Sequence, residues 1–83
     1  MPDNIDFVVN GKNLHLTRPG VERAMANVGP EPIRSHAVVV GETRYPVKQV
    51  FEIATGLDRL DFTSGTARRH LAKLGFELYR ADS

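Results

Sequence analysis

The hydrophobic and polar positions of this chain divide it at its glycines and prolines into short strand and helix segments. Two mainly apolar runs, residues 5–9 and 14–16, flank Asn10-Gly11. Both central residues of a type I′ turn need a positive φ, which Asn and Gly tolerate, so we expect a β-hairpin here. The gap between the two apolar runs is longer than two residues. A strict two-residue turn would therefore extend the second strand back to Lys12.

The next segment has the spacing of an amphipathic helix. Its apolar residues recur at i, i+3, i+4 and i+7, which places on one face Val21, Ala24, Met25 and Val28. Pro19 suits the first helical turn, and Thr17 is a candidate cap. Gly29 can take the left-handed position after the helix, and the prolines that follow it prevent continuation. We therefore predict a helix over residues 19–28.

A second hairpin and a second helix follow in the same order. The apolar run at 37–40 predicts a strand that is buried on both faces or central in its sheet. Gly41-Glu42 suits a type II′ turn into a short strand at 43–45. A helix then runs from Pro46 to the glycine at 56. Its predicted buried face is Val47, Val50, Phe51 and Ala54, and its outward face is Lys48, Gln49, Glu52 and Thr55.

A third helix and a last strand complete the pattern. Thr63 or Ser64 can cap this helix, whose predicted buried face is Ala67, His70, Leu71 and Leu74. Gly75 ends it, and residues 76–79 form the strand. The sequence thus predicts a single α+β domain over residues 1–83, in the order ββα-ββα-αβ. We expect a small antiparallel or mixed sheet, made of two hairpins and a C-terminal strand, covered on one face by three helices.

Composition restricts the class of protein without identifying a partner. The chain has 83 residues, room for one core, and its 41% hydrophobic and 25% charged residues argue against disorder. It has no cysteine, which excludes disulfides and thiolate metal sites. Its acidic start does not resemble a signal peptide, and no stretch approaches the roughly 20 apolar residues of a membrane span. We expect a cytoplasmic domain without membrane contact.

The distribution of charge is more informative than the net charge of +1. Residues 63–76 contain no acidic residue, whereas the predicted third helix is basic. Thr66, Arg69 and Lys73 share the face opposite the core, and Arg68 flanks it. The hydroxyls and the helix N-terminus can meet phosphate, and Arg can bind guanine through two hydrogen bonds. Together with the preceding helix this favours an embedded helix-turn-helix, and DNA binding through residues 64–74 is our leading hypothesis.

Three further cations are candidates for phosphate contacts, namely Lys48, Arg44 and Arg59. Lys48 would contribute if it formed one surface with Gly41 and Tyr45. The alternative is an ion pair with Glu52, which follows it at i+4. Because one chain offers few cations, DNA binding also predicts a homodimer or a larger partner chain.

Two other kinds of partner stay open. Cations in the second half of a helix are stabilised by the helix dipole, so a basic face does not require a nucleic acid. A protein-interaction module, such as a regulatory subunit or an antitoxin-like partner, would expose an apolar patch. The candidate residues for that patch are Ile53, Leu57, Leu60 and Phe62. RNA binding would need aromatic rings on an open sheet face, for which Tyr45 and Tyr79 are candidates.

The sequence contains no recognisable catalytic, metal or cofactor motif. Its carboxylates are scattered, and no Ser or Thr lies in a nucleophile-elbow sequence. The three histidines lack the spacing of metal ligands, and the glycines are spaced as turns and helix ends. We therefore expect a binding domain with no cofactor and no catalytic role.

Residues 41–78 resemble a segment of small, mostly actinobacterial proteins and of accessory modules fused to bacterial nucleases. The resemblance lies in Gly41, Tyr45-Pro46, Lys48, Ala54-Thr55-Gly56, Phe62-Thr63-Ser64, Ala67-Arg68-Arg69 and Leu74-Gly75-Phe76. It implies a role related to DNA. The pattern A-R-R-x-L-x-x-L-G-F also resembles recognition helices of helix-turn-helix domains, in which Thr66, Arg68 and Arg69 occupy exposed positions. Only one short strand follows, which argues against the winged variety.

Overall fold

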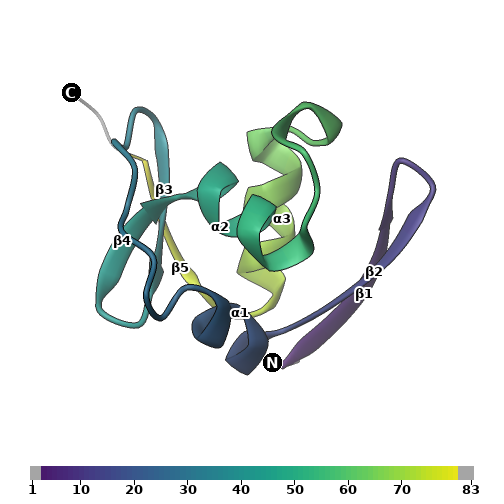
Figure 1. The fold of residues 1–83 in the computed structure, drawn as a ribbon, viewed down its shortest axis with the longest axis horizontal. Coiled ribbons are helices and arrows are strands. Elements are labelled where there is room, and N and C mark those ends of the chain that lie inside the picture. Colours follow the sequence, from purple (N-terminus) through teal and green to yellow (C-terminus); the bar gives the residue numbers. More distant parts are fainter. Residues whose placement is uncertain (1–2, 81–83) are drawn as a thin grey trace.

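The computed structural model of the chain describes residues 3–80 and has an α+β fold. The helices lie between two small antiparallel sheets (Figure 1). One sheet is the N-terminal hairpin of β1 and β2, and the other has the strand order β4-β3-β5. The predicted order of elements is confirmed. The strands, however, do not join into a single sheet covered on one face, because the hairpin packs against the side of the helices that the three-stranded sheet leaves uncovered.

The N-terminal hairpin is formed by β1 (Asn4–Val9) and β2 (Lys12–Thr17). Val9 pairs with Lys12, so the turn has two residues and the second strand starts at Lys12. Asn10 and Gly11 have φ values of 49° and 77°, the positive φ at both positions that a type I′ turn requires. The hairpin prediction is confirmed.

The first helix, α1 (Arg18–Ala24), is shorter than predicted. The Oγ1 of Thr17 accepts the Gly20 N–H at 2.9 Å, as expected for the cap. The expectation that the helix continues to Val28 and ends at a left-handed Gly29 is wrong. The carbonyl oxygens of Met25 and Val28 instead accept hydrogen bonds from the hydroxyl of Tyr45, at 3.1 and 3.0 Å. This buried phenol therefore stabilises a turn in place of the last helical turn.

The three-stranded sheet consists of β3 (His36–Val40), β4 (Thr43–Pro46) and β5 (Glu77–Arg80). The central strand is β3, with Val38 and Val40 buried, as the apolar run predicts. Val40 pairs with Thr43 across the turn, and Gly41 has a φ of 65°. That positive φ at the first central position agrees with the predicted type II′ turn.

Two helices pack together in the middle of the molecule, α2 (Val47–Thr55) and α3 (Ser64–Lys73). A short 3-10 helix, η1 (Arg59–Asp61), lies in their connection. Gly56 ends α2 in the left-handed conformation with a φ of 76°, as predicted. The connection over 56–63 is longer than the turn of roughly three to four residues in a compact helix-turn-helix.

Gln49 is buried, although the helical pattern placed it on the outward face of α2. Its Nε2 donates to the Gly29 carbonyl oxygen at 2.9 Å, and its Oε1 accepts the Glu31 N–H at 2.9 Å. The side-chain amide thus makes the hydrogen bonds that water would otherwise make with backbone groups of the irregular segment after α1. Periodicity could not show this, because the partners lie in a segment without a repeating pattern.

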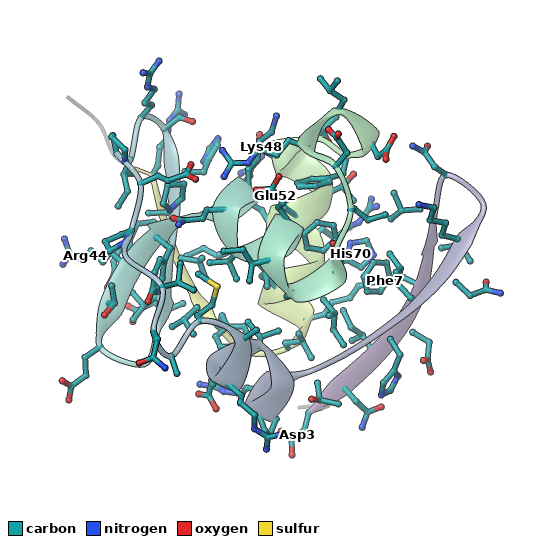
Figure 2. All side chains as sticks on the ribbon, viewed as in Figure 1. Asp3, Phe7, Arg44, Lys48, Glu52 and His70 are labelled. Carbon is teal, nitrogen blue, oxygen red and sulfur yellow. The ribbon has the colours of Figure 1, made fainter. Side chains whose placement is uncertain are left out.

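An aromatic cluster joins the hairpin to both central helices. The ring of His70 stacks on Phe7 with centroids 4.0 Å apart, and Phe51 lies 5.7 Å from Phe7 and 5.9 Å from His70 (Figure 2). His70 is only 6% exposed, and its Nδ1 lies 2.9 Å from the carbonyl oxygen of Thr66. Since a carbonyl can only accept, Nδ1 is the donor. The predicted buried face of α3 is confirmed in all four residues.

Burial lowers the pKa of His70 below its ordinary value, the hydrogen bond to the Thr66 carbonyl offsets part of this, and the nearby positive charges of Arg69 and Lys73 lower the pKa further. The unfolded chain therefore takes up a proton more readily than the folded chain. We expect the free energy of unfolding to fall as the pH drops below about 6.5. Replacing His70 with Phe keeps the ring stack but removes the titrating group. Urea unfolding followed by circular dichroism should show a smaller fall in the variant; an equal fall in both proteins would contradict this role.

The Gln49 contacts predict a local loss of stability. Gln49→Met keeps an unbranched side chain of similar size but leaves both backbone partners without the amide. We expect a loss of roughly 1–3 kcal/mol of unfolding free energy, measured by urea denaturation. Ile53→Met is the control on the same helix, at a position that is 38% exposed. The assignment is wrong if both variants lose equally little.

Candidate functional site

The start of α3 is fixed by hydroxyl groups. Thr63 Oγ1 accepts the Thr66 N–H at 3.2 Å and lies 3.2 Å from the Thr66 hydroxyl. Thr63 is therefore the cap, and the Thr66 side chain is half-buried in the same small network. The first turn of α3 contains no acidic side chain.

The basic residues of α3 lie on different parts of its surface. Arg69 and Lys73 are exposed, and neither forms an ion pair with any described residue. Arg68 is half-buried, and its Nε is enclosed without a hydrogen-bond partner among the described residues. Because Ser64 and Arg68 are i and i+4, they share one flank, while Thr66 and Lys73 share the other. The structure thus confirms exposure for Arg69 and Lys73, and separates Arg68 from them.

A pocket of about 460 Å³ lies on the Ser64 side of α3. Its walls come from the connection at 31–36, from the start of α2, and from the side chains of Arg59 and Ser64. Lys48 lies in the first turn of α2 and lines this pocket together with Arg34 and His36. Lys48 does not share a surface with Gly41 and Tyr45, because Tyr45 is buried and its hydroxyl points to the segment after α1.

The electrostatic surroundings of His36 are positive. Burial lowers the pKa of His36 first, and the charges of Arg68 and Arg80 lower it further. The positive charge of Arg68 therefore acts on the same region that Lys48 and Arg34 line. Three side chains that the sequence analysis did not select, Arg34, His36 and Ser64, belong to this region. No periodic pattern covers 29–35, so no sequence pattern could place Arg34 beside Lys48.

Arg59 does not stand free for a phosphate group. Its Nη2 lies 2.7 Å from a Glu31 oxygen, and its Nε lies 2.8 Å from a Glu52 oxygen. Hydrogen bonds to both carboxylates raise the pKa of Arg59, and the same contact lowers the pKa of Glu31. The candidate Lys48–Glu52 ion pair is accordingly not formed. Arg59 instead ties the connection after α1 to α2 and η1.

Arg44 lies on the wrong face of the sheet to join α3. Adjacent residues of a strand point to opposite faces, so the inward Tyr45 places Arg44 outward. Figure 2 shows it on the side of the sheet away from the helices. Its guanidinium lies 5.0 Å from the ring centroid of Tyr79. Arg44 therefore does not form one surface with α3.

The residues proposed for other partners are divided by the fold. Leu57 and Phe62 are buried, which leaves Ile53 and Leu60 exposed at 38% and 93%. The apolar patch predicted for a protein partner is therefore reduced to two side chains. Of the two aromatic rings considered for RNA, Tyr45 is buried and Tyr79 lies beneath Arg44. The described strands thus offer no open aromatic face.

Two further features of the described residues restrict the site. His, Asp and Glu side chains within 3–80 form no group of three that could hold a metal ion. Within the same range, the structure has no helix with the length and apolar character needed to cross a membrane.

No curated protein and no solved structure is significantly similar to this chain. A family model does match, over residues 7–83, which covers all of the elements from the middle of β1 onward. The match includes the aromatic cluster, the pocket and the basic helix α3. The chain belongs to the SCO5918-like family.

Proposed function

We propose that this chain is a DNA-binding domain that contacts duplex DNA through α3. The observation that carries the proposal is the pair of exposed cations, Arg69 and Lys73, which no described carboxylate neutralises. Unpaired cations on a rigid helix are suited to phosphate groups, which dominate the affinity of proteins for DNA. Elsewhere in the fold, the carboxylates of Glu31 and Glu52 are held by Arg59.

The packing of α3 supports this role. Its buried face is anchored by Ala67, Leu71 and Leu74, which are at most 1% exposed. The exposed side chains therefore project from a helix that cannot rotate without opening the core. The helix follows α2 in the order of a helix-turn-helix, with a looser connection, and α3 is the recognition helix of this proposal.

The remaining predicted contacts have different weights. Lys48 and Arg68 would add contacts on the Ser64 flank of α3, whereas Thr66 contributes through the hydrogen bonds at the helix start rather than through a free hydroxyl. One chain supplies few cations, so we propose that a homodimer presents two α3 helices to the duplex. A regulatory or accessory role fits the resemblance of residues 41–78 to nuclease-associated modules.

The proposal predicts that DNA binding depends on salt, and that this dependence becomes weaker when the two cations of α3 are removed. Fluorescence anisotropy with a labelled duplex should show binding that weakens as salt increases from about 50 to about 200 mM. The double variant Arg69→Ala/Lys73→Ala should bind more weakly and reduce the log–log salt slope by about two, roughly one per cation. The effect should be similar for different DNA sequences if both residues contact phosphates.

The matched control is Arg44→Ala/Lys12→Ala, which removes the same charge from the outer sheet face and from the hairpin turn. It should leave the salt slope unchanged, and circular dichroism should show that both variants are folded. Equal weakening in the two double variants would mean that net charge alone drives binding. Absence of binding by the unmodified protein at low salt would disprove the proposal.

A further inference from the structure

The pocket between the connection at 31–36 and the starts of α2 and α3 has a chemistry that the proposed DNA contacts of Arg69 and Lys73 do not use. Cations reach it from separate elements, Arg34 from the connection and Lys48 from α2. Neither forms an ion pair with a described residue. Two carboxylates are close, but Glu31 and Glu52 are both engaged by Arg59. Glu31 and Glu52 together with Arg34, Lys48 and Arg59 carry one net positive charge, so the pocket is positive on balance.

The same pocket contains hydrogen-bond donors that suit an oxyanion. Ser35 and Ser64, which each carry a hydroxyl, line it. The backbone at the start of α2 has no side-chain cap, because Pro46 occupies the cap position and no acidic residue lies in the first turn. Helix-start N–H groups there lack an internal partner. Arg68 does not line the pocket, but its charge reaches His36 on the pocket wall.

The size and charge of the pocket suit a terminal phosphate better than the backbone of a duplex. Its volume of about 460 Å³ is many times the roughly 30 Å³ of one liquid water, so a phosphate and part of an attached group fit inside. A phosphomonoester carries close to two negative charges and three acceptor oxygens, which cations on separate walls can approach from different sides. An internal phosphodiester carries one charge and lies on a convex surface.

We infer that this pocket binds a phosphomonoester group, with Arg34 and Lys48 as its principal cations and Ser35 and Ser64 as hydroxyl donors. The source is a free phosphate compound or the 5′-terminal phosphate of a nucleic-acid strand. The inference does not rest on DNA binding by α3, because Arg69 and Lys73 do not line the pocket.

The direct experiment is a titration of the ¹⁵N-labelled protein with inorganic phosphate, followed by amide chemical shifts at constant ionic strength. Saturable shifts are expected at residues 34–36, 47–49 and 64–65. Arg34→Met/Lys48→Met should weaken binding at least about tenfold, since it removes two charge-assisted contacts. Arg44→Met/Lys12→Met is the charge-matched control and should retain binding. Both sites of the first variant are outside the core, so it should remain folded.

The pKa of His36 gives a second readout that loss of structure would not reproduce. A dianion beside the ring favours the imidazolium, so saturating phosphate should raise the pKa of His36 measured by NMR. His15, in the other sheet, serves as the internal reference. Shifts that do not saturate, or that are equal in the two double variants, would overturn the inference, as would an unchanged His36.

Two comparisons distinguish the sources of the phosphate, and either positive result supports the pocket. Tighter binding of thymidine monophosphate than of thymidine would point to a small phosphomonoester. Tighter binding of a 5′-phosphorylated duplex than of a 5′-hydroxyl duplex, lost in Arg34→Met/Lys48→Met, would point to a strand end. Arg69→Ala/Lys73→Ala should keep phosphate binding. Failure of the DNA-binding proposal for α3 would therefore not affect the result expected for the pocket.

Discussion

The contact of Phe7, Phe51 and His70 is the interaction on which the arrangement of this domain depends. It brings together a residue of β1, one of α2 and one of α3, and thereby fixes the hairpin against both helices. An isolated two-stranded hairpin is marginal in water, so its apolar face needs this cover. The neutral form of His70 suits the cluster, because its Nδ1 donates within α3 while its ring lies between apolar neighbours.

The orientation of the charged side chains follows from this packing. With Ala67, His70, Leu71 and Leu74 turned inward, Arg69 and Lys73 must face solvent, and Arg68 is directed to the other flank. The end of the helix is fixed as well. Arg18 donates to the Gly75 carbonyl at 3.0 Å and lies 5.0 Å from the Phe76 ring centroid. That cation is therefore structural, as is Arg59, whereas Arg69 and Lys73 on α3 and Arg34 and Lys48 at the pocket form no ion pair with a described residue.

Local patterns in the sequence predicted the elements well, because turns and caps depend on neighbouring residues. Asn10-Gly11, Gly41 and Gly56 adopt the positive φ values expected of them. The prediction for the end of α1 failed because the hydroxyl of Tyr45, distant in the sequence, bonds the carbonyls there. The same holds for Gln49, whose burial depends on backbone groups of a segment without periodicity.

The basic helix could be predicted from its lack of acidic residues, but the grouping of the other cations could not. Arg44 is separated from α3 by strand alternation, and Arg59 is held by two carboxylates, one of them 28 positions away in the sequence. Conversely, Arg34 and Lys48 line one pocket although they belong to different elements. Which cations are compensated is a property of the tertiary fold, and only the fold shows it.

The central claim is that the outward face of α3 is the surface that meets DNA. The most direct measurement is the map of amide chemical-shift changes when a short duplex is added to the ¹⁵N-labelled protein. We expect the largest changes along α3, at Arg69 and Lys73, with smaller changes near Lys48. Changes that gather on the outer sheet face, around Arg44 and Tyr79, would contradict the account, as would a spectrum that the duplex leaves unchanged.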